Sequence, residues 1–273
     1  MKAREKIKFN IRVHDKIARR YERIHDDLFS HVEQARLHGA LQEVIEVVRS
    51  SEKSPKALDV GCGSGNLTRH LVDLRVNTVS ADVSENFLKM VERRFSSTGL
   101  CKTLKLSGKD LANIEDHAFD IAAAYAVLHH VPDYLHLVRE MCRVLKPGGV
   151  IYLDHEVNET YYNKPLEYTQ FLKSVVPRTV VLKKYLRLLV SPSFYVRFVW
   201  KRINPTYQKE GDIHVWPDDH IEWDKVEQLL ISQNFEVLVK RDYLACKSSY
   251  RRDVYEQYKN RCNDTTMLIA RKK

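Results

Sequence analysis

A glycine-rich stretch early in the chain constrains the fold more than any other feature. It runs from Leu58 to Thr68 with the sequence LDVGCGSGNLT. The apolar run from Lys56 to Val60 has the character of a buried strand, three glycines at alternate positions follow it, and a helical pattern begins at about Asn66. Glycine allows backbone conformations closed to other residues and lets a ligand approach the main chain. The stretch therefore predicts a strand, a tight turn and a helix whose free N–H groups face a ligand.

The residues around the glycines narrow the class of ligand. No Gly-x-x-x-x-Gly-Lys-Ser/Thr pattern is present, so no lysine is placed for a nucleoside triphosphate. The carboxylate of Asp59 would repel a pyrophosphate but suits a ligand that carries an ammonium group. In this form the stretch resembles motif I of the class I S-adenosylmethionine-dependent methyltransferases. The resemblance implies that Asp59, Gly61, Cys62, Gly63 and Gly65 contact this methyl donor.

Length and composition are those of a globular protein. The 273 residues fit one domain with additions, or one domain and a small second one. The five cysteines are scattered and lack C-x-x-C spacing, so neither a disulfide framework nor a zinc site is indicated, and no metal site is predicted. The N-terminus has no apolar leader, and no later run approaches the length of a membrane span. We expect a cytoplasmic protein.

Predicted strands and helices alternate from Lys56 to Glu156, which indicates an α/β fold with a parallel sheet covered on both faces. Strands are expected at 56–60, 76–81, 101–106, 118–125, 150–155, 235–241 and 265–270, and helices at 66–74, 132–145 and 221–233. Two helices are expected before the first strand. The resemblance implies a seven-stranded Rossmann-like methyltransferase sheet of order 3-2-1-4-5-7-6 with its last strand antiparallel.

The predicted organisation has three parts. Residues 1–50 form N-terminal helices that cover part of the active site. Residues 51–156 and 218–273 form the donor-binding core. Residues 157–217 form a basic helical insertion after strand five, which is either a cap or a membrane-docking element.

Ligands of an open parallel sheet bind at the carboxyl ends of its strands. Asp82 follows the second strand, where a carboxylate can accept both hydroxyls of a ribose; the alternative is a plain helix-start residue. After the third strand, a match to the family's motif III implies that Asp110 accepts from the adenine amino group and that Leu111 donates its backbone N–H. The alternative for Asp110 is a surface-loop aspartate. Val83 and Ala126 complete the predicted donor contacts after the second and fourth strands.

The sequence Leu128-His129-His130 follows the fourth strand. It resembles a signature of the class I enzymes that methylate small molecules and lipids, including quinone-biosynthesis methyltransferases. It departs from the Asn/Asp-Pro-Pro-Tyr/Phe of amino-group methyltransferases, which counts against a base N-methyltransferase. A pKa near neutrality makes His129 and His130 candidate catalytic bases, with His130 marginally preferred. The alternative is that both histidines hold the loop by hydrogen bonds.

A second resemblance lies near the N-terminus. Ala18 and Tyr21 match the Ala-x-x-Tyr segment of small-molecule methyltransferases, which implies that Tyr21 lies over the donor pocket. The alternative for Tyr21 is an ordinary core-facing aromatic residue.

The excess positive charge is concentrated in one segment. The chain has a formal net charge of +9, and residues 168–209 contain nine basic residues and no Asp or Glu. Residues 179–190 and 194–203 are predicted to form basic amphipathic helices. Such helices suit an anionic membrane surface, a lid over an acidic acceptor, or a cap whose cations are simply solvated. Binding of nucleic acid is less favoured, and membrane docking would place the protein on the inner membrane face.

These features predict S-adenosylmethionine-dependent methyl transfer to a small-molecule or lipid-like acceptor by in-line displacement. An RNA methyltransferase and a non-catalytic, donor-binding adaptor at a membrane are the alternatives. The sequence leaves the acceptor atom and the oligomeric state open.

Overall fold

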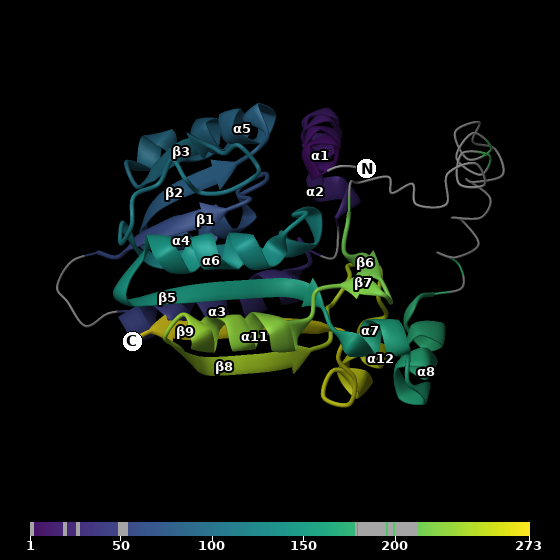
Figure 1. Ribbon diagram of the computed structural model, residues 1–273. Helices are drawn as coiled ribbons and strands as arrows, with labels where there is room; N and C mark the ends of the chain where they lie inside the picture. Colours follow the sequence, from purple (N-terminus) through teal and green to yellow (C-terminus); the bar gives the residue numbers. More distant parts are fainter. Residues whose placement is uncertain are drawn as a thin grey trace.

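A seven-stranded mixed sheet forms the centre of the protein (Figure 1). The structure, a computed structural model, describes residues 3–18, 21–25, 28–48, 54–177 and 212–273, with three single residues in between. The strands are β1 (Lys56–Val60), β2 (Asn77–Asp82), β3 (Cys101–Lys105), β4 (Phe119–Tyr125), β5 (Leu145–Val157), β8 (Phe235–Tyr243) and β9 (Thr265–Lys272). Their order is β3-β2-β1-β4-β5-β9-β8, and β9 is antiparallel to both of its neighbours. The predicted sheet order is confirmed.

Helices cover both faces of the sheet. The helices α6 (Tyr134–Val144) and α11 (Trp223–Ser232) lie on the front face in Figure 1, and α3 (His31–Val48) lies behind it with α4 (Asn66–Asp73) packed against α3. The helix α5 (Glu85–Phe95) packs against β2 and β3. Central strands such as β4 are almost wholly buried, as expected for parallel strands covered on two sides.

Three boundaries differ from the prediction. The N-terminal region contains three helices rather than two, because α1 (Ala3–Ile17) and α2 (Tyr21–Ile24) precede α3. The segment from Lys146 to Gly149, which precedes the predicted start of the fifth strand at residue 150, belongs to β5, whose pairing with β4 becomes irregular there. The polar connection at 247–263 contains a further helix, α12 (Arg252–Tyr258).

The described parts of the insertion include α7 (Glu159–Asn163), α8 (Leu166–Val175) and β6 (Val215–Trp216), which pairs with β7 (Asp219–His220) just beyond the insertion. The helix α8 packs on the connection between β8 and β9. Buried residues of α8, among them Phe171, form one apolar cluster with Leu244, Val254 and Tyr255. The predicted basic helices at 179–190 and 194–203 lie almost wholly outside the described residues.

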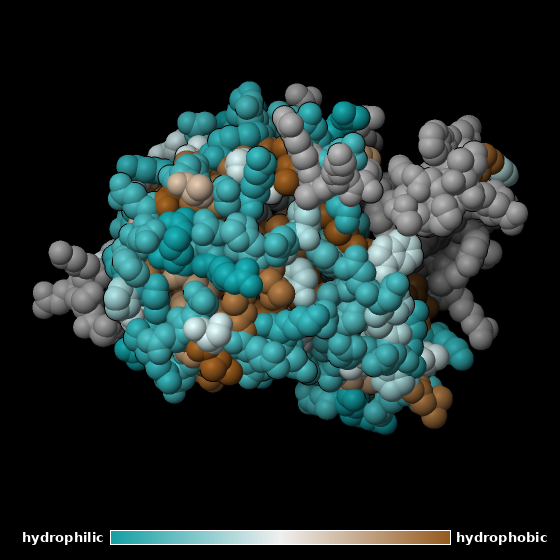
Figure 2. All heavy atoms as spheres, in the orientation of Figure 1, coloured by the Kyte–Doolittle hydropathy of each residue, from teal (hydrophilic) through white to brown (hydrophobic). Residues whose placement is uncertain are grey.

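Hydrophilic side chains cover most of the face seen in Figure 2, with hydrophobic ones in small separate groups. Among the described helices, none combines the length and the apolar character that crossing a lipid bilayer requires.

Candidate active site

A cavity opens at the carboxyl ends of β1, β2 and β4. The space between its walls is about 830 Å³, a figure that includes open solvent. Of the residues predicted from the sequence, its lining contains Tyr21, Gly61, Gly63, Asp82, Val83, Asp110, Leu111, Ala126 and His130. Residues from separate parts of the chain are thus brought together at one edge of the sheet.

A smaller cavity adjoins the first one. Asp59 and Cys62 line it together with Ser64 and Asn66. The two cavities share the wall residues Tyr21, Gly61, Gly63 and Ala126, so they are adjacent, and the pair is called the groove below. Of the predicted site residues, Gly65 and His129 line neither cavity.

The carboxylate of Asp82 stands between the glycine turn and the start of α5. Its Oδ2 accepts from the N–H of Gly63 at 2.9 Å, and its Oδ1 accepts from the N–H of Ser84 at 2.7 Å. Burial raises the pKa of Asp82, and the two backbone N–H groups partly offset this effect. Asp82 therefore fixes the turn as well as lining the cavity.

The three glycines of the turn have different surroundings. A Cβ on Gly63 would meet only a backbone oxygen at 4.0 Å, so this residue faces open space. A Cβ on Gly61 would lie 2.6 Å from Val127. A Cβ on Gly65 would lie 2.9 Å from Phe95, on α5 and away from the cavity. The predicted ligand contact by Gly65 is therefore not supported; it is a packing position with a positive φ of 90°.

Asp59 is buried beneath the smaller cavity. Its Oδ2 accepts from the hydroxyl of Thr68 at 2.6 Å, and the same hydroxyl lies 2.8 Å from Oγ of Ser80. Burial raises the pKa of Asp59 to about 7, and the negative charge of Asp82 adds to the rise. A cation that enters the smaller cavity would favour the ionised carboxylate.

Unsatisfied polar atoms gather around the smaller cavity. The Oγ of Ser64 and both amide atoms of Asn66 are buried and have no hydrogen-bond partner among the described residues. Buried polar groups are nearly always hydrogen-bonded, so these atoms fit a polar ligand. With Asp59 they provide donors for a carboxylate and acceptors for an ammonium group, the two charged groups of an amino acid.

The segment after β3 agrees with the prediction only in part. Asp110 lines the main cavity, and its Oδ1 lies 3.3 Å from the hydroxyl of Ser107. The N–H of Leu111, however, donates to Oε2 of Glu140 at 3.2 Å. The prediction that this N–H serves adenine is therefore not supported. The side chain of Leu111 still lines the cavity.

The two histidines after β4 have different partners. Nδ1 of His129 donates to Oε2 of Glu156 at 2.7 Å. The other oxygen of Glu156 accepts from the N–H groups of Val127 and Leu128 at 2.8 Å and 2.7 Å. Glu156 thus fixes the loop through three hydrogen bonds. This agrees with the alternative interpretation of His129, in which the histidine holds the loop by hydrogen bonds.

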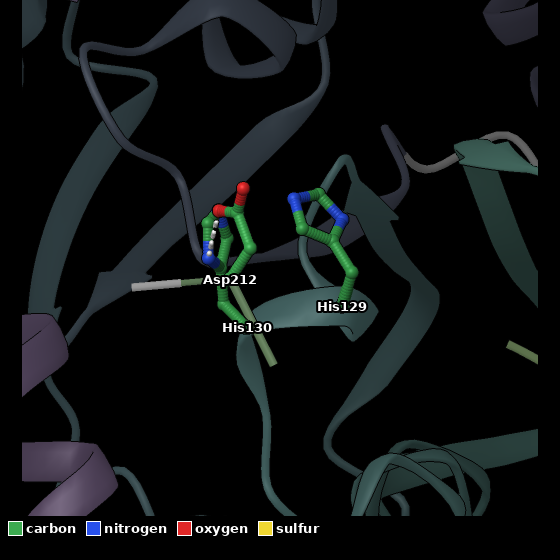
Figure 3. Close-up of side chains that lie close together, drawn as sticks. All are labelled: His129, His130 and Asp212. Atoms are coloured by element: carbon green, nitrogen blue, oxygen red, sulfur yellow. Dashed lines mark ion pairs between the residues drawn. The ribbon is translucent and has the colours of Figure 1, made fainter. Parts of the chain in front are cut away.

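His130 lies on the cavity wall. Its Nδ1 is 3.3 Å from Oδ1 of Asp212, a residue that reaches the site from the end of the insertion (Figure 3). Its carbonyl accepts from Nδ2 of Asn10 at 2.8 Å, and its ring meets the edge of the His14 ring at 4.9 Å between centroids. Charged, aromatic and amide groups from three segments therefore surround this imidazole.

The helix α1 supplies residues that the prediction did not assign to the site. Ile7, Asn10 and His14 line the main cavity. Burial lowers the pKa of His14. The spacing of His14 and Tyr21, seven residues apart, gives a weak signal that both share a face, but nothing in the sequence identifies Asn10 or Asp212.

A buried polar network lies beside the site without lining it. Arg36 contacts Glu33 and Asp154, each at 2.9 Å, and Tyr243 donates to Asp154 at 2.9 Å. The guanidinium of Arg36 also stacks 3.9 Å above the ring centroid of Tyr243. These contacts join α3 to the sheet.

Comparison with known proteins agrees with this geometry. A family model described as a methyltransferase domain matches residues 58–153. A demethylmenaquinone methyltransferase of Bacillus cytotoxicus is 30% identical over 172 residues, which cover 61% of this chain and 71% of that protein. A protein of the same name from Bacillus cereus matches equally.

Solved structures share the fold. An S-adenosylmethionine-dependent methyltransferase from Mesorhizobium loti has a TM-score of 0.55 at 17% identity, over 86% of this chain and 100% of that chain. One from Methanosarcina mazei has a TM-score of 0.53 at 19% identity, over 85% and 96% of the two chains. At these identities the likeness concerns the fold.

The chain belongs to the class I S-adenosylmethionine-dependent methyltransferases. It is an enzyme of this class, and S-adenosylmethionine is its cofactor. The residues present fit this donor, because the unsatisfied atoms of Ser64 and Asn66 adjoin Asp59 at one end of the groove and Asp82 and Asp110 line the other.

Proposed function

We propose that the protein transfers the methyl group of S-adenosylmethionine to a small, hydroquinone-like acceptor by in-line displacement. The observation that carries the proposal is that Gly63, Asp82, Asp110 and His130 line one cavity. A histidine and the predicted donor contacts therefore face the same space. The relatives named demethylmenaquinone methyltransferase support an acceptor of this chemical class.

The proposed roles of the donor contacts follow from their positions. Asp82 accepts from the ribose hydroxyls, and Asp110 lies at the adenine end. Asp59, Ser64 and Asn66 hold the amino and carboxylate groups. Because the sulfonium already activates the methyl group, the main task of the protein is alignment, which can supply roughly 7–11 kcal/mol in favourable cases.

The acceptor must also lose a proton. A phenol-type oxygen donates more electron density as its anion, whether the attacking atom is that oxygen or a ring carbon. The imidazole of His130, which lines the cavity with its Nδ1 3.3 Å from Oδ1 of Asp212, would accept this proton. Asp212 would then stabilise the imidazolium, while His129 and Glu156 keep the loop in place.

The experiment uses full-length protein and S-adenosylmethionine labelled in the methyl group. The acceptors are a reduced demethylmenaquinone and, separately, total lipid, soluble-metabolite and RNA fractions. We expect label in the reduced quinone and in the lipid fraction. Label confined to RNA, or none despite measurable donor binding, would contradict the proposal.

Two matched variants test the donor contacts. Asp82→Asn removes the charge from a buried carboxylate at the cavity, whereas Asp73→Asn does so at an exposed position at the end of α4. We expect the first to raise the donor Kd by at least about tenfold, as for a hydrogen bond to a charged group worth roughly 1.5–3 kcal/mol. We expect the second to leave it unchanged. Isothermal titration calorimetry measures both; equal Kd values would contradict the role given to Asp82.

A further inference from the structure

We infer that His129, His130 and Asp212 form a binding site for a divalent transition-metal ion. One ligand atom from each residue lies within 4.8 Å of the others, and Figure 3 shows the His129 ring with one nitrogen directed toward the carboxylate of Asp212. The set joins the loop after β4 to the end of the insertion. Neither the methyl-transfer chemistry nor the similarity to relatives calls for an ion here.

The separation of two of the ligand atoms matches a shared ion. Nδ1 of His130 and Oδ1 of Asp212 are 3.3 Å apart. Ligands at roughly 2.0–2.2 Å from a tetrahedral ion lie about 3.3–3.6 Å from each other. An ion can therefore join this pair with little movement, and the third ligand atom, on His129, lies within 4.8 Å of both.

The second coordination shell is already in place for His129. Nδ1 donates to Glu156, which leaves Nε2 with a lone pair. This carboxylate–histidine arrangement orients metal-binding imidazoles and raises their basicity. The main chain is fixed too, because the carbonyl of His129 accepts from the N–H groups of Ile213 and His214 at 2.8 Å and 3.1 Å. Ile213, which follows Asp212, is thus hydrogen-bonded directly to His129, one of the proposed ligands.

A second observation points to a ligand at this place. Oδ1 of Asn10 is buried and has no hydrogen-bond partner among the described residues. Asn10 lines the same cavity wall as His130, to whose carbonyl it is bonded. A water molecule on the ion would supply the missing donor. Three protein ligands and an open position for water are typical of sites that also bind substrate.

The donor set selects the kind of ion. Two imidazoles and one carboxylate suit Zn²⁺, Co²⁺, Fe²⁺ or Mn²⁺, whereas Mg²⁺ and Ca²⁺ favour oxygen ligands. Metal binding also competes with the proton transfer proposed for His130. With Nδ1 on an ion the hydrogen moves to Nε2, which can then no longer accept a proton. The metal-free protein would therefore carry out the proton transfer proposed for His130, and a bound ion would prevent it.

Cobalt titration tests the site, because Co²⁺ bound to nitrogen and oxygen ligands absorbs visible light. Chelator-treated full-length protein is titrated with Co²⁺, and its donor affinity is measured on the same preparation. We expect one equivalent to bind with visible absorption bands. His129→Ala, His130→Ala and Asp212→Asn should each weaken binding at least tenfold, and Glu156→Gln by about 10–100-fold.

The matched control is His31→Ala, which removes an exposed histidine at the start of α3 and should bind Co²⁺ like the wild type. Circular dichroism shows that each variant is folded. Absence of Co²⁺ bands in wild-type protein that still binds the donor would overturn the inference and leave methyl transfer intact. Binding that survives all three ligand substitutions would overturn it as well.

Discussion

At the scale of single residues, Asp59 differs most from its ordinary chemistry. The sequence predicts an acidic residue before the glycines, and the structure adds that this carboxylate is buried, with the pKa raised to about 7. Its partner is the neutral hydroxyl of Thr68. The pKa of Asp59 therefore lies near physiological pH rather than near its ordinary value of 3.8.

This shift predicts how stability depends on pH. Between about pH 4 and 7 the folded protein holds a proton on Asp59 that the unfolded chain releases, so this residue makes the free energy of unfolding fall as the pH rises. Its contribution to the slope reaches at most about 1.4 kcal/mol per pH unit. Asp59→Asn keeps an oxygen for Thr68 and should flatten the dependence.

Urea unfolding at pH 5 and pH 8 measures this effect. Asp73→Asn, at an exposed position, should keep the wild-type difference between the two pH values. An equal fall in stability for wild-type protein and Asp59→Asn would show that Asp59 does not titrate in this window.

Whether a site residue can be predicted from the sequence depends on how far along the chain it lies from the residues that it contacts. Asp82 could be predicted because it directly follows a strand of a parallel sheet, where the fold itself brings residues together. Asp212 could not, because its approach to His130 depends on how an insertion folds back over the sheet. The hydrogen bond of Leu111 could not be predicted either, because its backbone N–H donates to Glu140, which is distant in the sequence.

At the scale of the elements, Gly65 joins two helices. It starts α4 in a left-handed conformation, and it faces Phe95 and Val91 of α5. Gly61, Gly63 and Gly65 look alike in the sequence. Only the packing in the structure shows that Gly65 faces α5 and that Gly63 faces open space.

Gly65→Ala should therefore lower stability more than an ordinary helix substitution. The positive φ and the contact at 2.9 Å with Phe95 predict a loss of about 1–3 kcal/mol in the free energy of unfolding. Gly39→Ala in α3, with nothing within 4 Å of the added Cβ, should raise it by about 0.5–1 kcal/mol. Urea unfolding measures both. Similar losses in the two variants would contradict this account of Gly65.

The order of the helices and strands could be predicted from the sequence more accurately than the residues at which they begin and end. The sequence pattern predicts every strand of the sheet, because central strands such as β4 are apolar runs and the edge strands β3 and β8 keep apolar residues among polar ones. It does not show that β5 starts at Leu145, since the glycines at 148 and 149 are typical of a turn. The helix α12 was missed because its exposed face is polar and only Val254 and Tyr255 are buried.

At the scale of the whole molecule, the α8–α12 cluster forms a second apolar centre beside the sheet. Phe171 is fully buried in it and contacts the rings of Tyr250 and Tyr258. Tyr168 donates to Asp264 at 3.0 Å, which ties the cluster to the start of β9.

Phe171→Ala should destabilise the protein without changing the donor site. The cavity left behind predicts a loss of about 3–5 kcal/mol in the free energy of unfolding, while the donor Kd stays unchanged because no residue of this cluster lines the groove. Leu172→Ala, which removes a 36% exposed side chain next to it, serves as the control. Chemical unfolding and calorimetry give the two readouts. A large rise in the donor Kd would show that the cluster and the groove are coupled.

The backbone carbonyls of His129 and His130 accept hydrogen bonds from an earlier segment of the chain and from a later one. Ile213 and His214 bond the carbonyl of His129, and Asn10 bonds that of His130. During synthesis on the ribosome, the glycine turn at 61–65 emerges about 150 residues before Asp212. The residues that line the two cavities all lie between Ile7 and Leu137, so a nascent chain contains the whole cavity lining before the segment that bonds the carbonyl of His129 has been made.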